Sequence, residues 1–131
     1  MREIKFRVWD IDRKEWLKNT GNPYIFPFDG RVAMKCAGDS TGHIDKQDYS
    51  EEYELEQFTG LRDKKGKEIY EGDIVRFGPY KANTETIQVP IEFHEGSFVM
   101  MREGLGYLIN TRVVGEAAEV IGNIHETPEL L

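Results

Sequence analysis

Apolar and polar residues alternate in short runs along this chain, and turn-forming residues separate the runs. Residues 4–8 alternate apolar with basic side chains, which is the pattern of a half-buried strand. A polar turn over residues 10–14 leads to a returning strand over residues 15–17, so the sequence predicts an opening β-hairpin. Further strands are predicted over residues 31–37 and 51–58.

From residue 59 onward the pattern predicts a compact β unit, with a turn at residues 63–66. Its strands are predicted over residues 74–77, 87–93, 98–101 and 119–124. Pro90 removes a backbone donor from the strand over 87–93, so we expect that strand to lie at a sheet edge or to carry a bulge. Residues 112–120 fit either a helix or a strand. Thr127 and Pro128 predict one short helical turn at the end of the chain, because Thr suits the cap and Pro the first helical position.

Residues 19–30 hold an aromatic cluster between glycines and prolines. Tyr24, Phe26 and Phe28 stand among Pro23 and Pro27, and two prolines disfavour a central strand. We favour a loop that folds back over the core, because apolar side chains are usually buried. The alternative is an exposed loop whose Tyr24, Phe26 and Phe28 dock on a partner.

Composition supports an all-β fold. Residues that favour strands (Val, Ile, Thr, Tyr, Phe and Trp) number 41, whereas the apolar helix formers Ala, Leu and Met number 16. Branched and aromatic side chains suit the pleated surface of a sheet. This balance excludes a helical bundle and an α/β enzyme with several helices.

Charge is negative overall and unevenly distributed along the chain. The formal net charge is −7, with +2 over residues 1–18, −6 over 39–56 and −6 over 85–131. Such a chain is repelled by phosphate and by anionic lipid, so neither nucleic acid nor membrane is a favoured partner, and segregated charge suits recognition between protein surfaces. The single Cys36 forms no internal disulfide, and we expect a cytoplasmic protein.

Catalytic motifs are absent or incomplete. Ser40 lies in a Gly-x-Ser-x-Gly match over residues 38–42, but the following residues lack the helical apolar stripe that such a motif needs. The segment 60–68 approaches a phosphate-binding loop, with five residues instead of four between its glycines. Three scattered histidines do not make a metal motif. We therefore expect a protein that is not an enzyme and has no catalytic, metal or cofactor residues.

A basic turn keeps nucleic acid binding as an alternative. Arg62, Lys64, Lys65 and Lys67 gather in six residues, and a local basic patch is what phosphate contacts require. Asp63 and Glu68 largely cancel these charges, so we favour a solvated surface turn over a binding site.

Three segments together carry a family resemblance. They are residues 1–10, 57–75 and 119–131, with Glu71-Gly72-Asp73-Ile74-Val75 in the middle segment. In this order and spacing they resemble the YopX-like family of bacteriophage and prophage proteins. The resemblance implies two small β-barrel-like subdomains: residues 1–56, with a long loop over 19–50, and residues 57–131, similar to an SH3 barrel. It implies no established activity and no functional residues.

These observations favour a phage or prophage accessory protein that works by protein–protein contact, as a homo-oligomer or with a phage or host protein, in the cytoplasm of the bacterial host. Segregated charge and the aromatic loop support this hypothesis. The alternative is a nucleic-acid-binding module that uses residues 62–67.

Overall fold

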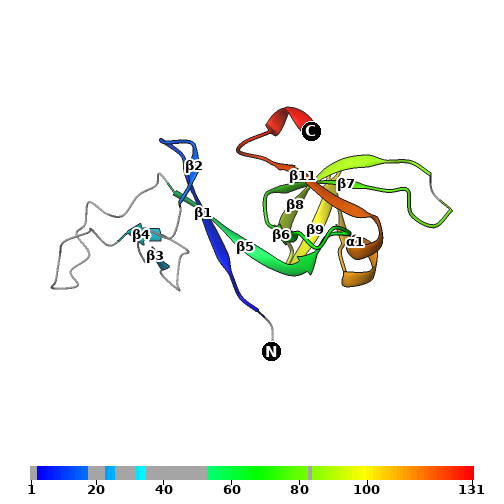
Figure 1. Cartoon of the computed structure of the whole chain (residues 1–131), viewed down its shortest axis with the longest axis horizontal. Coiled ribbons are helices and arrows are strands. Elements are labelled where there is room, and N and C mark those ends of the chain that lie inside the picture. Colours follow the sequence, from blue (N-terminus) through cyan, green and yellow to red (C-terminus); the bar gives the residue numbers. More distant parts are fainter. Residues whose placement is uncertain (1–2, 18–22, 26–31, 35–52, 83) are drawn as a thin grey trace. The chain divides into compact units, whose positions relative to one another are not determined.

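The computed structural model describes residues 3–17, 23–25, 32–34, 53–82 and 84–131. Within these ranges strands dominate, and the helical elements are one short α-helix and one 3-10 turn (Figure 1). This confirms the predicted all-β class with little helix. The similarity of residues 57–131 to an SH3 barrel stays a prediction. Two compact units are distinguished, Phe6–Glu56 and a larger one that combines Met1–Lys5 with Gln57–Leu131.

The smaller unit begins with the predicted hairpin. Strand β1 (Phe6–Asp10) pairs antiparallel with β2 (Glu15–Trp16), and the register places Trp9 opposite Trp16. The two indole rings meet edge to face with centroids 4.9 Å apart, and the Arg7 guanidinium lies 4.3 Å from the Trp16 ring centroid. Aromatic and cation–π contacts of this kind stabilise a short hairpin beyond its backbone bonds.

A second hairpin in this unit corrects one expectation. Strand β3 (Pro23–Ile25) pairs antiparallel with β4 (Val32–Met34), so residues 23–25 form a strand where a loop was expected. In a two-stranded sheet each strand is an edge, and Pro23 is tolerated there because an edge leaves room for a missing donor. Strand β4 confirms the short strand predicted within 31–37.

Strand β5 (Tyr53–Arg62) begins in the smaller unit and ends in the larger one, where it pairs antiparallel with β6 (Glu68–Tyr70). The larger unit also holds a five-stranded antiparallel sheet in the order β10-β9-β8-β7-β11. Its strands are β7 (Asp73–Phe77), β8 (Ile87–His94), β9 (Ser97–Arg102), β10 (Leu105–Leu108) and β11 (Ala118–Asn123). Helix α1 (Thr111–Ala117) joins β10 to β11, and the 3-10 turn η2 (Pro128–Leu130) follows β11.

The core of the larger unit is aliphatic and draws on most of these elements. It consists of Ile69, Val75, Val89, Ile91, Met100, Val114, Ala118 and Val120. In β8 the buried residues Val89 and Ile91 alternate with more exposed ones, as in a strand with one buried face, whereas in β7 three consecutive residues, Asp73, Ile74 and Val75, are buried. Burial of apolar side chains is the main force that holds such a small unit together.

Strand β8 is central and its two pairings show no register shift, so the expectation that Pro90 marks a sheet edge or a bulge is wrong. The strand pairs with β7 through Ile87–Pro90 and with β9 through Ile91–His94. Pro90 therefore lies where the strand changes partner, and a missing backbone donor is tolerated at that position.

The C-terminal part contains both a helix and a strand. The residues that fitted either element divide between α1 and β11, and the Asn110 side chain caps the helix by accepting a bond from the Val113 N–H at 3.0 Å. The predicted helical turn is present as η2. Thr127 stands at its cap position, but its hydroxyl contacts the Asn123 backbone instead of capping the turn. None of the helices in the described ranges is long and apolar enough to cross a bilayer.

Candidate functional site

Two Glu-Gly turns connect the strands β8, β9 and β10, which form two successive hairpins and end at one edge of the five-stranded sheet. Glu95-Gly96 joins β8 to β9, and Glu103-Gly104 joins β9 to β10. All four residues have positive φ, between 49° and 82°. Two-residue hairpin loops of type I′ need positive φ at both central positions, and glycine adopts it without a steric cost. The sequence thus dictates two tight hairpins, which set the register of β10.

Strand β10 is an edge strand with an apolar surface. It pairs with β9 from Leu105 opposite Arg102 to Leu108 opposite Val99, and it stands last in the sheet order. Leu105, Tyr107 and Leu108 are 61%, 50% and 70% exposed. The four residues include no charge and no proline, which are the usual means of protecting an edge from pairing with another chain.

The opposite edge of the sheet, β11, is covered by the turn over residues 62–67. The Ala118 carbonyl accepts a bond from the Lys64 N–H at 3.0 Å, and the Val120 N–H donates to Asp63 Oδ2 at 2.9 Å. Backbone groups of β11 that would otherwise face solvent are therefore bonded within the chain. The two edges of one sheet differ in this respect, and β10 is the exposed one.

An apolar groove of about 390 Å³ opens beside β10. It is lined by Phe77, Tyr80, Glu85, Ile87, Val89, Met100, Arg102, Tyr107, Leu108 and Val113. Val89 and Met100 belong to the core, so the groove continues the core to the surface. Its two charged residues neutralise each other, since Arg102 Nη2 lies 3.0 Å from Glu85 Oε1. The groove therefore offers aromatic and aliphatic contact without an uncompensated charge.

A second, more polar hollow lies along the same strand. It has a volume of about 440 Å³ and is lined by His94, Glu95, Ser97, Val99, Gly104, Leu105, Gly106 and Leu108. His94 Nε2 lies 3.9 Å from Glu95 Oε1, and the Glu95 side chain is largely exposed. Strand β10 thus contributes to two hollows of different chemistry.

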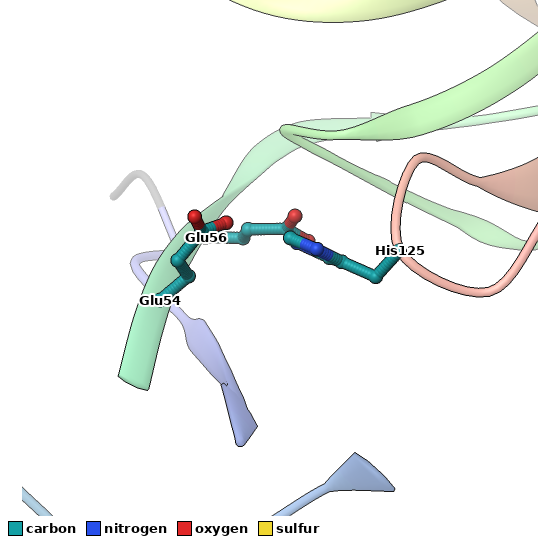
Figure 2. A group of neighbouring side chains, drawn as sticks. All are labelled: Glu54, Glu56 and His125. Atoms are coloured by element: carbon teal, nitrogen blue, oxygen red, sulfur yellow. The ribbon is translucent and has the colours of Figure 1, made fainter. Parts of the chain in front are cut away.

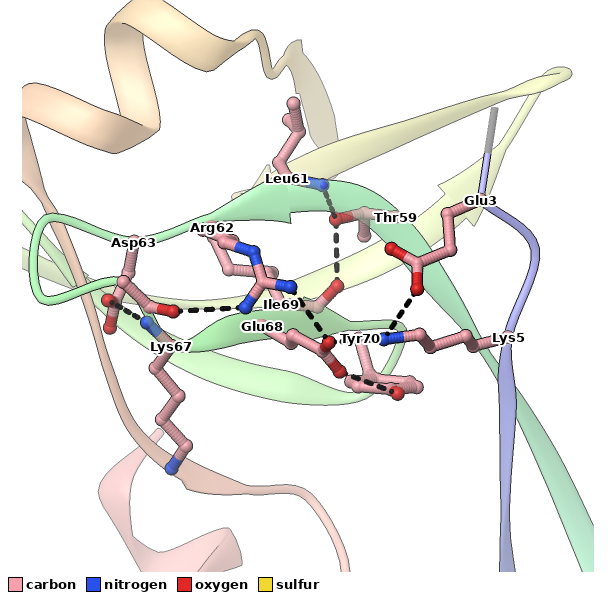
Figure 3. Close-up of polar contacts among 11 residues, drawn as sticks. Glu3, Lys5, Thr59, Leu61, Arg62, Asp63, Lys67, Glu68, Ile69 and Tyr70 are labelled. Carbon is pink, nitrogen blue, oxygen red and sulfur yellow. Dashed lines mark hydrogen bonds and ion pairs between the residues drawn. The ribbon is translucent and has the colours of Figure 1, made fainter. Parts of the chain in front are cut away.

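The basic turn, the sequence-based candidate for nucleic acid binding, is built around a buried carboxylate. Asp63 Oδ1 accepts a bond from the Lys67 backbone N–H (Figure 3) and another from the Lys65 backbone N–H, each at 2.9 Å. With the Val120 bond, three backbone donors converge on one buried side chain. The bonds of Asp63 therefore hold the turn between β5 and β6 against strand β11.

Acidic neighbours compensate most cations of this turn. Arg62 Nη2 and Lys5 Nζ lie 3.1 and 2.5 Å from Glu68 Oε1, and the Tyr70 hydroxyl donates to Glu68 Oε2 at 3.0 Å (Figure 3). The bond from Lys5 holds the pKa of Glu68 below its usual value. A phosphate at Arg62 would therefore have to compete with the Glu68 carboxylate.

Glu119 pairs with the next two cations. Lys65 Nζ and Lys64 Nζ lie 2.5 and 3.7 Å from its carboxylate, and the Lys65 bond lowers the pKa of Glu119. Among the described residues Lys67 is the one cation of the turn whose ammonium has no such acidic partner. The structure therefore brings the four basic residues together and pairs three of them with two carboxylates, Glu68 and Glu119.

The aromatic candidates are only partly within the described residues. Tyr24 belongs to strand β3, opposite Ala33 of β4. Phe26 and Phe28 lie outside the described residues, as does Ser40. Docking by this segment stays a prediction.

Strand β5 carries two neighbouring carboxylates on one face, and the buried one has a structural role. Glu54 and Glu56 are two residues apart on that strand (Figure 2). Glu56 is buried, and its Oε2 accepts bonds from Arg7 Nε at 2.8 Å and from Arg7 Nη2 at 2.7 Å. A buried carboxylate needs such a partner, and here Arg7 joins β1 to β5. His125, also drawn in Figure 2, belongs to the larger unit, where its backbone N–H donates to Asn123 Oδ1 at 2.8 Å.

The sequence profile of the YopX protein family matches residues 5–131. The chain belongs to the YopX family. This confirms the resemblance carried by residues 1–10, 57–75 and 119–131. A search of curated proteins found no match.

Two solved structures share the fold over the whole chain. The crystal structure of protein EF1440 from Enterococcus faecalis is 32% identical, with a TM-score of 0.71, and the match covers 100% of this chain and 99% of that one. The X-ray crystal structure of protein yopX from Bacillus subtilis is 23% identical, with a TM-score of 0.61 and the same coverage. The YopX-family fold thus extends from end to end of this chain.

Sequence reasoning missed strand β10. Its residues, Leu105-Gly106-Tyr107-Leu108, are too few to show a clear alternation, and Gly106 interrupts the apolar run. The available signal was the repeated Glu-Gly pair at 95–96 and 103–104. Each pair can form a two-residue hairpin turn, and the second pair therefore implies a further strand after residue 104.

Proposed function

We propose that this YopX-family protein is a non-enzymatic protein-interaction module that contacts another polypeptide through the exposed edge of β10. One observation carries the proposal: an apolar edge strand without charge or proline lies beside an apolar groove that continues the core. Exposed edges of this kind pair readily with another chain, and adjoining apolar surface adds binding energy.

The contrast with β11 supports a role in binding. The same chain covers the β11 edge with bonds from residues 63 and 64, so protection of an edge is within reach of this fold. Leaving β10 exposed creates an aggregation hazard unless a partner covers it. A binding surface is the simplest explanation for an edge that remains unprotected.

We place this role in a bacteriophage or prophage context, in the cytoplasm of the bacterial host. Family membership supports the setting, and the single cysteine is in keeping with a reducing compartment. The absence of a coherent catalytic motif in the sequence supports a function without catalysis.

Nucleic acid binding through the basic turn has less support than protein contact. Glu68 and Glu119 already pair with three of its cations, so a phosphate would have to displace these carboxylates. Affinity for nucleic acid rises with the number of phosphates that a protein neutralises, and one uncompensated lysine gives little.

Site-specific photo-crosslinking in the bacterial host tests the proposal. A photoreactive benzoyl-phenylalanine replaces Leu108 on the edge or, as a matched control, Leu131, which is 59% exposed and outside β10. We expect discrete crosslinked species of defined mass from position 108 and none from position 131. A lack of crosslinks at position 108, or identical products from both positions, would contradict the proposed surface.

A further inference from the structure

The two hollows flank β10 on opposite faces of the sheet. On β9, Met100 and Arg102 line the apolar groove, whereas Ser97 and Val99 line the polar hollow. On β10, Tyr107 lines the groove, Leu105 and Gly106 line the hollow, and Leu108 borders both. Neighbouring residues of a strand point to opposite faces. A further strand paired with β10 would therefore direct its side chains alternately toward the apolar groove and toward the polar hollow.

Acidic residues near the two ends of β10 indicate which charge the polar residues of an added strand should carry. Glu95 lies in the turn beside the Leu108 end of β10, and Glu103 lies in the turn at the Leu105 end. Both side chains are exposed, whereas the Arg102–Glu85 pair makes the groove electrically neutral. Residues 85–131 as a whole contain eight acidic and two basic residues. An added strand thus meets Glu95 at the polar hollow, Glu103 in the turn beyond the Leu105 end of β10, and apolar surface on the side of the groove.

A second copy of the chain fits this edge poorly. In an antiparallel β10–β10 pair, the Leu105 end of one copy meets the Leu108 end of the other. Glu103 of one copy would then face the turn that holds Glu95 in the other, and like charges placed opposite each other oppose association. The occupant that fits is a segment of a different protein.

We propose that β10 binds an extended segment of a partner protein in which apolar residues alternate with lysine or arginine. This inference rests on the proposed function and deepens it. The segment adds one strand to the sheet, its apolar side chains enter the groove beside Tyr107, and its basic side chains face Glu95 and Glu103. Strand addition supplies backbone hydrogen bonds, and alternate side chains supply the specificity.

A capped, fluorescein-labelled hexapeptide, Lys-Val-Lys-Phe-Lys-Val, is the probe, and fluorescence anisotropy measures its binding to the full chain. Two peptides are controls for pattern and charge: Lys-Lys-Lys-Val-Phe-Val has the same composition without alternation, and Glu-Val-Glu-Phe-Glu-Val has the opposite charge. We expect the alternating basic peptide to bind about tenfold tighter than either control. Equal affinity for the three peptides would overturn the proposal.

Variants locate the binding. Tyr107→Ser weakens binding about tenfold because it removes an aromatic wall of the groove, whereas Leu131→Ser has no effect. The double variant Glu95→Gln, Glu103→Gln weakens it about threefold and flattens its salt dependence, as expected for charges at the rim of an interface. Binding that none of these changes affects would overturn the assignment to β10. Circular dichroism establishes that each variant keeps its β structure.

Strand addition has its own readout. N-methylation of alternate peptide amides removes donors without changing the side chains, and in one of the two possible phases it abolishes binding by strand addition. Unchanged affinity in both phases contradicts strand addition. Light scattering tests whether a second copy of the chain occupies β10 instead. If the wild type is a dimer and Tyr107→Ser is a monomer, the occupant is a second copy and the partner segment is rejected.

The two proposals fail differently. Crosslinks from position 108 combined with equal affinity for the three peptides leave the β10 surface standing and reject only the alternating basic segment. The absence of crosslinks from position 108 rejects the surface itself.

Discussion

Replacing Asp63 by alanine tests whether one buried carboxylate holds the basic turn and the β11 edge together. The wild-type side chain accepts bonds from the Lys65, Lys67 and Val120 N–H groups, each at 2.9 Å. A hydrogen bond to a charged group contributes about 1.5–3 kcal/mol, and a buried donor left without a partner costs about 1–3 kcal/mol. The lysine amides belong to a surface turn where water replaces the carboxylate, so the Val120 amide dominates. We expect Asp63→Ala to lower the free energy of unfolding by about 2–4 kcal/mol.

Asp63→Asn separates the bonds from the charge. An asparagine keeps one acceptor oxygen, which serves either the two turn amides or the Val120 amide, and it turns an NH₂ group toward the remaining donor. We therefore expect a smaller loss than for alanine. Glu129→Ala is the matched control, because it removes an exposed carboxylate of the same unit and we expect a change within about 0.5 kcal/mol.

Urea unfolding followed by two probes measures these differences. Both tryptophans of the chain, Trp9 and Trp16, belong to the smaller unit, so tryptophan fluorescence reports that unit, whereas far-UV circular dichroism also reports the larger one. Two probes are needed because separate units violate two-state unfolding. The reasoning is refuted if Asp63→Ala unfolds at the same urea concentration as Glu129→Ala by circular dichroism.

Three further changes probe other contacts. Gly122→Ala lowers the unfolding free energy by about 1–3 kcal/mol in urea titrations, because the added Cβ overlaps the Thr127 side chain; an unchanged midpoint would contradict this packing. Glu68→Gln reduces the loss of stability in acid, because the bond from Lys5 lowers the pKa of Glu68 in the folded protein. The ionised Glu68 therefore stabilises the wild type fully above the ordinary pKa of a glutamate, and this stabilisation disappears as pH falls through the lower folded value. If the urea midpoint falls equally in wild type and variant between pH 7 and pH 3, the prediction is refuted. We expect wild type and Lys67→Ala to bind single-stranded DNA equally weakly at low salt, as measured by fluorescence anisotropy. Wild-type binding that is tight at low salt and falls steeply as salt rises would support the nucleic-acid alternative.

Local sequence patterns predicted most of the fold because each depended on neighbouring residues. The opening hairpin follows from alternation and a polar turn, and the strands β7 and β9 follow from short apolar runs. Pro90 was misjudged because its effect depends on which neighbour each half of β8 pairs with. That information is tertiary and has no local signature.

The candidate site depended more strongly on contacts between distant residues. The basic turn was visible in the sequence, but its neutralisation requires Glu119, which is more than fifty residues away along the chain. Two cations of the turn meet that carboxylate only because β11 folds beside the turn. Charge counts along the chain could not show this compensation.

The exposed edge of the five-stranded sheet is not the strand that contains proline. The sequence predicts that the strand with Pro90 lies at an edge or carries a bulge, because proline removes a backbone donor. The structure assigns that strand to the centre and the edge to β10, which has neither proline nor charge. Proline and charge protect an edge from pairing, so a strand that lacks both is the one available to a partner. In the proposed complex, Glu95 and Glu103 near its two ends select among partners by charge, which would join the segregated acidity of residues 85–131 to one defined surface.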